Sequence, residues 1–208
     1  KGAGSWSLGQ ETAGTWDYYS LWLNGLPFAD AQGHWAVPEI IEVCHAGLMK
    51  GISETAFAPD RAVTRAEAAV ILTRLLNLPV SGEPAEVFWD LDGHWAEKEI
   101  VAMAGQGLLE GVGDGRFEPD TAITREQAAL LLYRCAARLD MDPAALMAKT
   151  FQFSDAGHVS GYAAQAVSWA AANGLLLGSG GLLRPMDEVT RAQMAALLLR
   201  FEKIRKGW

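Results

Sequence analysis

The sequence of 208 residues has only two cysteines, Cys44 and Cys135, and four histidines. Both cysteines fall in stretches with apolar residues at helical spacing, so we expect buried free thiols, and nothing in their spacing favours a disulfide. No histidine has a second histidine, cysteine or carboxylate at the spacing of a metal site. The scarcity of these residues gives no support to a disulfide framework, and we expect no metal and no cofactor.

Basic residues are also few: 17 lysines and arginines face 25 acidic residues, for a net charge of -8 and a pI near 5.0. Nucleic-acid binders normally present a basic face, so we expect no nucleic-acid partner. An anionic ligand would have to be bound by a few well-placed arginines. No apolar run approaches the roughly 18 residues that span a bilayer, so membrane insertion is not expected. Half of the residues are hydrophobic, which suits one or two globular domains.

The beginning of the chain lacks an initiator methionine and the basic and apolar segments of a signal peptide, as the segment KGAGSWSLGQ shows. We therefore expect that the chain starts inside a longer protein. The missing signal then says nothing about where that protein goes.

What the sequence does contain is a threefold internal repeat. The segments VTRAEAAVIL, ITREQAALLL and VTRAQMAALL begin at Val63, Ile123 and Val189. The first two units keep a 60-residue spacing, and the third has drifted, with two residues more before Tyr162 and one fewer before Arg191. No helix pair is large enough to bury its apolar face alone, so we expect the three units to share one core.

Each unit predicts two helices joined by a turn-rich loop. The first helix is expected to end at a glycine in the left-handed conformation, at Gly51, Gly111 or Gly178. A capping box is expected to open the second helix: a threonine N-cap followed three residues later by Glu or Gln. The threonines are Thr64, Thr124 and Thr190, and their partners are Glu67, Gln127 and Gln193.

Capping leaves one residue of the motif unexplained, the arginine at Arg65, Arg125 and Arg191. A cation in the first turn opposes the helix dipole at a cost of about 0.3–1 kcal/mol. One interpretation is an anion site, in which the guanidinium and free helix N–H groups converge. The other is that the arginines pair with carboxylates and hold the repeats together.

The repeated motifs resemble the S-layer homology family: F-x-D, then G-H-W-A, G-L-x-x-G, F-x-P-D and T-R-A-E, over about 180 of the 208 residues. The resemblance implies a mainly α fold, with three helix-loop-helix repeats packed in pseudo-threefold symmetry around a central helical bundle, after a short irregular or strand leader. We expect repeats at 27–79, 87–141 and 152–206, in one monomeric pseudo-trimer. It also implies an extracellular protein at the bacterial cell wall or S-layer, whose inter-repeat grooves bind a cell-wall polysaccharide. That ligand would be a pyruvylated secondary polymer or peptidoglycan.

The resemblance also implies a set of glycan-binding residues. The arginine would read a pyruvate carboxylate, an aromatic residue would pack on the sugar, and the F-x-D aspartate would accept sugar hydroxyls. The aromatics have an alternative role in the core, and the aspartates an alternative role in bonding loop backbone. The set comprises Arg65, Arg125, Arg191, Thr64, Thr124, Thr190, Trp35, Trp95, Tyr162, Asp30, Asp90 and Asp155.

Two departures from the pattern carry expectations of their own. Unit three lacks G-H-W-A, has Met186 in place of the loop aspartate and has a shortened loop, so its groove should be altered or weaker. In unit two Glu126 follows the arginine, where it would either compete for Arg125 or face solvent. The recurring histidines His34, His94 and His158 are interpreted as structural.

Residues 1–26 form a leader rich in tryptophan and glycine. The segments WSLGQE and GTWDYY resemble the last strand and loop of a glycoside hydrolase family 18 barrel, in which Trp6 would be the tryptophan beneath the sugar. An aromatic linker is the alternative. That family's D-x-x-D-x-D-x-E motif is missing, and a (β/α)8 barrel needs about 250 residues, so we expect no catalysis by this chain alone.

Three hypotheses follow for function. The first is a non-catalytic module that anchors a secreted protein to the cell wall. The second is the C-terminal part of a family 18-type hydrolase, whose repeats direct it to peptidoglycan or a chitin-like substrate. The third is a protein–protein scaffold, which predicts that all three arginines are buried in ion pairs.

Overall fold

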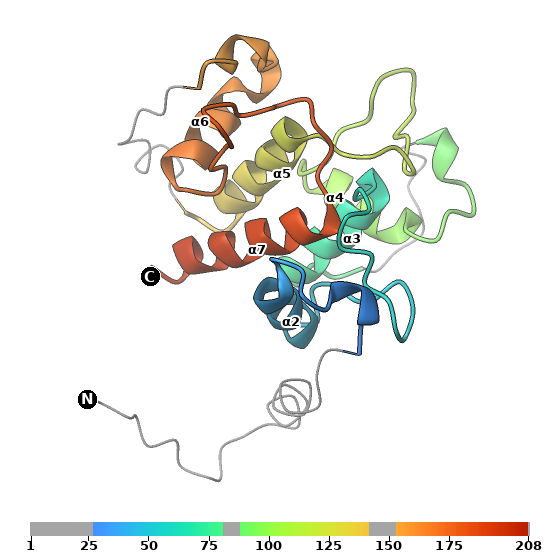
Figure 1. The fold of residues 1–208 in the computed structure, drawn as a ribbon. Coiled ribbons are helices and arrows are strands. Elements are labelled where there is room, and N and C mark those ends of the chain that lie inside the picture. The colour runs from blue at the N-terminus through green and yellow to red at the C-terminus, as the bar shows by residue number, and fades with distance from the viewer. Residues whose placement is uncertain (1–26, 81–87, 142–152, 208) are drawn as a thin grey trace.

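The computed structural model describes residues 27–80, 88–141 and 153–207, which form a mainly helical structure (Figure 1). The described residues contain six α-helices and four short 3₁₀ turns, and no strand. The expected mainly α fold of three helical repeats is confirmed. The leader with its predicted hydrolase segment lies outside the described residues. The helices are α2 (Val37–His45), α3 (Arg65–Leu75), α4 (Glu97–Gly105), α5 (Arg125–Arg138), α6 (Ala164–Ala172) and α7 (Arg191–Arg205), and the turns are η1 (Ala29–Ala31), η2 (Trp89–Leu91), η3 (Ala156–His158) and η4 (Gly161–Ala163).

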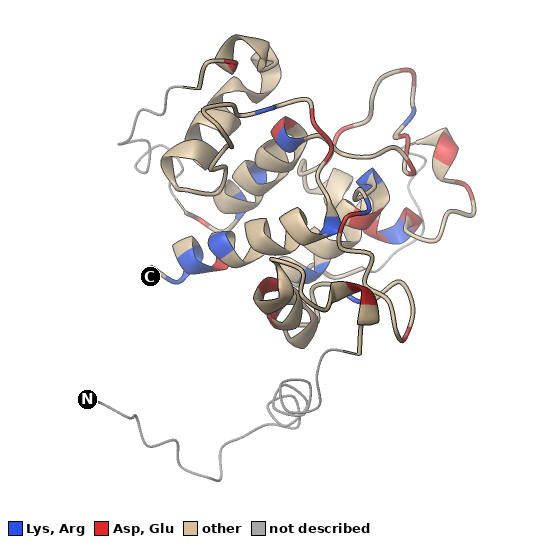
Figure 2. Ribbon diagram, in the orientation of Figure 1, with Lys and Arg blue, Asp and Glu red and all other residues tan. Residues whose placement is uncertain are grey.

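The helices pair between units in a closed cycle. The first helix of unit two, α4, packs on α3 of unit one, and α6 of unit three packs on α5 of unit two. The cycle closes when α2 of unit one packs on α7 of unit three, as Figure 1 shows. In Figure 2 the middle of α7 carries no charge and its charged residues lie toward its ends. Each unit therefore completes its neighbour, and all three contribute to one hydrophobic core.

A ring of backbone hydrogen bonds links the residues before the three threonines. The N–H of Val63 donates to the carbonyl of Val189 (2.9 Å), that of Ile123 to Val63 (2.9 Å), and that of Val189 to Ile123 (3.0 Å). All three side chains are buried. Extended backbone in a buried setting favours β-branched residues, which explains why each motif begins with one.

The capping boxes predicted at the second helices are present in all three units. Each threonine hydroxyl accepts the N–H of the residue three positions later, and the Glu or Gln side chain accepts the N–H of the threonine. These local signals fix the starts of α3, α5 and α7, and they therefore fix the position of the arginine in the first turn.

The predicted end of the first helix is wrong. The left-handed glycines that directly follow the first helices are Gly47, Gly107 and Gly174, with φ of 68°, 70° and 70°, four residues before the expected positions. Gly178 also has a left-handed backbone, with φ of 67°, but it lies beyond the end of its helix. The glycines at the expected positions serve a different need. A Cβ on Gly111 would lie 2.5 Å from Cε1 of Phe88, so the glycine makes room for the phenylalanine of the F-x-D motif.

Both cysteines are free thiols, as the sequence predicts. Burial raises the pKa of Cys44 to about 11 and that of Cys135 to about 12. No helix within the described ranges combines the length and apolar character needed to cross a membrane.

Candidate functional site

The site begins with the three F-x-D aspartates, whose carboxylates bind the loop of their own unit. Both oxygens of each carboxylate accept consecutive backbone N–H groups, at 2.7–2.9 Å for Asp30, 2.7–3.1 Å for Asp90 and 2.7 Å for Asp155. The second residue of each pair has a left-handed backbone, with φ between 56° and 58°. The loop-bonding alternative for these aspartates is thus present in the structure. The loop pairs are Phe57 and Ala58, Phe117 and Glu118, and Leu183 and Arg184.

The arginine of each T-R motif binds the same loop residue from the opposite side, across a unit boundary. The Nε of Arg65 donates to the carbonyl of Phe117 at 2.7 Å, and that of Arg125 to Leu183 at 2.8 Å. The Nε of Arg191 donates to Phe57 at 2.7 Å, which closes the cycle. One loop residue in each unit is therefore clamped by an aspartate through its N–H and by the preceding unit's arginine through its carbonyl.

The expectation of free N–H groups beside the arginines is wrong. The N–H of Arg65 donates to the carbonyl of Thr121 and that of Ala66 to Pro119, both at 2.9 Å. We call each boundary where a T-R arginine binds the loop of the neighbouring unit a junction, and the other two junctions repeat this pattern. The third N–H is taken by the threonine cap. Capacity for an anion at these junctions therefore lies in the guanidinium nitrogens and not in the helix ends.

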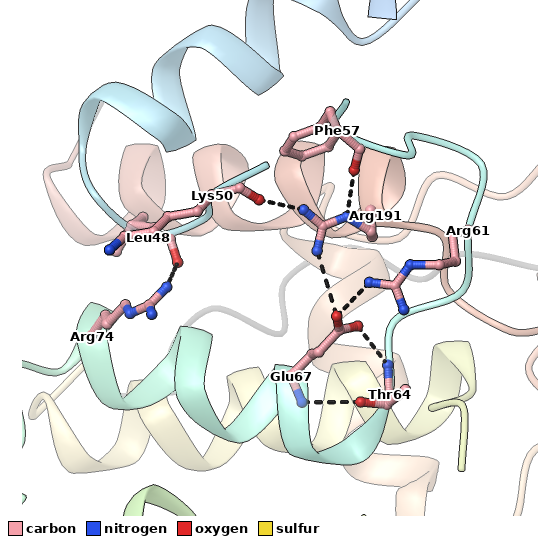
Figure 3. A network of polar contacts seen from close by, with 8 residues as sticks. All are labelled: Leu48, Lys50, Phe57, Arg61, Thr64, Glu67, Arg74 and Arg191. Atoms are coloured by element: carbon pink, nitrogen blue, oxygen red, sulfur yellow. Dashed lines mark hydrogen bonds and ion pairs between the residues drawn. The ribbon is translucent and has the colours of Figure 1, made fainter. Parts of the chain in front are cut away.

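Arg191 is the most buried of the three arginines, with 5% of the residue exposed. Its Nη2 donates to the carbonyl of Lys50, and its Nη1 lies 3.7 Å from Oε1 of Glu67 (Figure 3). The central carbon of its guanidinium lies 4.5 Å from the centre of the Phe57 ring. The same Glu67 oxygen also accepts a hydrogen bond from Arg61. Among the described residues, this junction alone matches the scaffold hypothesis of a buried arginine beside a carboxylate.

The other two guanidiniums are half-buried and bind carbonyls instead of carboxylates. Arg65 also donates from Nη2 to the carbonyl of Glu110 (2.9 Å) and lies 4.4 Å above the Phe117 ring. At Arg125 the equivalent ring is replaced by Leu183, and the described residues offer its two terminal nitrogens no hydrogen bond or ion pair. Burial lowers the pKa of Arg125 below its ordinary value; among nearby charges Asp187 opposes this shift.

Two grooves bring an arginine and an exposed aromatic residue together. A groove of about 290 Å³ is lined by Arg125, Trp35 and Leu183, and a second of about 360 Å³ by Arg65, Tyr162 and Phe117. Trp35 is 58% exposed and Tyr162 is 59% exposed, so neither fills the core. Each groove draws on all three units, because its arginine, its loop and its aromatic residue come from different ones.

The remaining predicted residues stand apart from these two grooves. Trp95 is also exposed, at 63%. The threonine hydroxyls act in the capping boxes described above. His34 accepts the N–H of Ala36 on Nδ1 and meets Asp60 at 3.3 Å through Nε2, and His94 repeats this arrangement, which suits the structural interpretation of these two. Among the described residues no group of three or more histidines, cysteines and acids is arranged to hold a metal ion.

Glu126 does neither of the things expected of it. It is 1% exposed and accepts hydrogen bonds from the hydroxyl of Tyr162 at 2.7 Å and the N–H of Ser160 at 2.9 Å. The other two units have alanine at this position and tryptophan at the aromatic position. This paired change, from alanine to glutamate and from tryptophan to tyrosine, was the signal in the sequence that could have predicted the contact between Glu126 and Tyr162.

A second arginine in each unit was missed by sequence reasoning. It stands nine residues after the first, at Arg74, Arg134 and Arg200, and donates to a carbonyl near the end of its own first helix segment, at 3.2, 3.4 and 3.0 Å. Arg200 lines the groove of Arg125, and Arg134 lines that of Arg65. The constant spacing of nine residues between the two arginines of each unit could have identified the second arginine as part of the repeat.

Comparisons with known proteins agree with the repeat pattern. A sequence model described as the S-layer homology domain matches residues 27–69, 87–129 and 152–195. The chain is 29% identical over 183 residues to the S-layer protein sap of Bacillus anthracis, covering 86% of this chain and 22% of that protein. It is 33% identical over 177 residues to an endoglucanase of Bacillus sp. strain KSM-635, covering 84% and 18%.

A third relative is an S-layer protein of Bacillus licheniformis, with 30% identity over 181 residues, covering 86% of this chain and 20% of that protein. The chain thus spans about a fifth of the length of these three relatives.

Proposed function

Since the chain belongs to the S-layer homology family, we propose that its grooves bind an anionic, pyruvylated secondary cell-wall polymer and so tether a longer protein. The protein is extracellular and associated with the bacterial cell surface and cell wall. The observation that carries the proposal is the groove of Arg125, which also holds an exposed tryptophan, and where no described residue pairs with the terminal nitrogens of the guanidinium.

The chemistry of that groove suits a sugar that carries a carboxylate. A guanidinium presents parallel N–H donors that match both oxygens of a carboxylate, and an exposed indole offers a flat apolar face. A cationic wall ligand is less well served, because both oxygens of Asp30, Asp90 and Asp155 already accept loop N–H groups. These facts support an anionic ligand over an amine-bearing one.

The repeats act in this proposal as a non-catalytic and monomeric anchor. The cycle of helix pairs closes within one chain, so the grooves need no second copy. Enzymes such as the endoglucanase share the anchoring region over about a fifth of their length, which is consistent with a separate catalytic part. A hydrolase upstream of this chain would leave the role of the repeats unchanged.

Co-sedimentation with cell-wall sacculi of an S-layer-forming Bacillus, before and after acid extraction of the secondary polymer, tests the proposal. Wild-type protein should sediment with intact sacculi and stay in solution with extracted ones. A double variant, Arg65→Ala with Arg125→Ala, should lose most binding. The matched control is Arg116→Ala, which removes a surface arginine paired with Glu118 outside both grooves. Equal sedimentation with extracted sacculi would reject the secondary polymer as ligand.

A further inference from the structure

We infer that the three junctions have divided their roles: the Arg125 groove is the principal carboxylate site, and the Arg191 junction is a closed structural latch. The inference rests on the proposed function, because it assigns the anionic ligand of that function to one groove. A division of roles differs from the simple expectation that three copies of one motif make three equal binding sites.

The latch is closed because every part of the Arg191 guanidinium is engaged by the chain itself. Two carbonyls and the Glu67 carboxylate meet its three nitrogens, and the residue is 5% exposed. Glu67 is fixed in turn, because its other oxygen accepts the N–H of Thr64 at 3.1 Å (Figure 3). A ligand carboxylate would have to displace a carboxylate that is already held by the capping box and by Arg61.

One substitution between the repeats accounts for the difference in charge. The capping-box position is Glu67 in unit one, but it is Gln127 in unit two and Gln193 in unit three. Gln127 lines the groove of Arg65, and Gln193 lines that of Arg125. A carboxamide caps the helix equally well and adds no negative charge, so at this position the two glutamine grooves lack the carboxylate that the third junction has.

The Arg125 groove has the most capacity for a new anion. Its loop residue is Leu183 instead of phenylalanine, and within the described ranges the ring contacts of Arg65 and Arg191 have no counterpart at Arg125. Arg184 and Arg200 line the groove as well, which gives three cationic side chains against the two acids Asp187 and Glu188. The shortened loop of unit three was expected to alter or weaken its groove. It lines the Arg125 groove, to which we assign the strongest binding of the carboxylate.

The Arg65 groove ranks second. Its arginine already donates to two carbonyls and lies against the Phe117 ring. Its second cation, Arg134, is paired with Glu110 at 2.8 Å. One guanidinium nitrogen of Arg65 is left without a partner among the described residues, against two for Arg125.

The test uses a methyl glycoside of N-acetylmannosamine carrying a 4,6-linked pyruvate ketal, with the same sugar without the ketal as control. Titrating this probe into the wild-type chain while recording arginine Nε–H resonances needs no folded variant at the latch. Single Arg65→Lys and Arg125→Lys variants assign two of the signals, and proximity to the Phe57 ring assigns the Arg191 signal. We expect the Arg125 signal to move most, the Arg65 signal less, and the Arg191 signal to stay in place.

Calorimetry with the same probe supplies the magnitudes. Arg125→Ala should weaken binding at least tenfold, whereas Glu67→Gln should leave it within about twofold. A shift at Arg191, or equal losses for Arg65→Ala and Arg125→Ala, would overturn the division of roles while leaving the proposed function standing. If the wild-type protein fails to distinguish the ketal from the control sugar, the anionic ligand itself is wrong, and the assignment of Arg125 is wrong with it.

Discussion

The assignment of Arg191 as a latch predicts that Arg191→Ala destabilises the fold far more than Arg125→Ala. Arg191→Ala removes two hydrogen bonds from a charged donor to carbonyls and removes the buried cation that lies beside Glu67. Hydrogen bonds to charged groups contribute about 1.5–3 kcal/mol each, and breaking a buried pair costs about 3–5 kcal/mol. These effects overlap, so we expect a loss of about 4–5 kcal/mol.

Truncation at Arg125 removes one such hydrogen bond from a half-buried side chain, for which we expect a loss of about 1.5–2 kcal/mol. The two variants should therefore differ by about 2–3.5 kcal/mol in the free energy of unfolding. At about 2–4 °C per kcal/mol for a chain of this size, Tm should differ by about 4–14 °C. Urea titrations should give equal slopes with separated midpoints. Equal midpoints would refute the view that Arg191 is a structural residue and Arg125 is not.

Three further predictions concern other parts of the molecule. Tyr162→Phe should cost about 1–3 kcal/mol of stability in urea unfolding, because it removes one hydrogen-bond donor from the buried Glu126 carboxylate; no loss would argue against that contact. Burial raises the pKa of Asp90, but hydrogen bonds from two loop N–H groups bring it below its ordinary 3.8. Its contribution to stability is therefore complete above about pH 4 and is lost as the pH falls through the lowered pKa, and Asp90→Asn should flatten that dependence in acid unfolding. The Cys135 thiol, with a pKa of about 12, should react with a disulfide reagent at pH 8 only as fast as the chain opens, and fast labelling of the native protein would contradict its burial.

The local part of the structure was predictable because its signals are local. Thr64 with Glu67 specifies a capping box within four residues, and the structure forms it in every unit. The first helix was harder, because two glycines compete for its end. Gly47 has the left-handed backbone, whereas Gly51 is set by the phenylalanine ring of its own unit, and that contact cannot be deduced from helix signals.

The partners of the arginines were not predictable from one unit at a time. Arg65 finds its carbonyls at Phe117 and Glu110, which lie 52 and 45 residues away in the next unit. The repeated motif in the sequence does not indicate that the arginine of each unit donates hydrogen bonds to a loop of the neighbouring unit. The burial of Glu126 was missed for the same reason, since the hydroxyl that it holds belongs to unit three.

The cyclic arrangement connects binding to folding. A ligand in the Arg125 groove would lie against Trp35 of unit one, Arg125 of unit two and Leu183 of unit three. Because those residues converge only when the helix pairs of all units are closed, an open chain cannot offer the site. Ligand that binds only the closed form stabilises it by mass action, by about 2.7 kcal/mol at a hundred times Kd. The arginine repeats three times because each of the three unit boundaries uses one to bind the loop of the neighbouring unit. In the proposed function, ligand binds best at the boundary where the described residues leave the terminal nitrogens of the guanidinium without a partner.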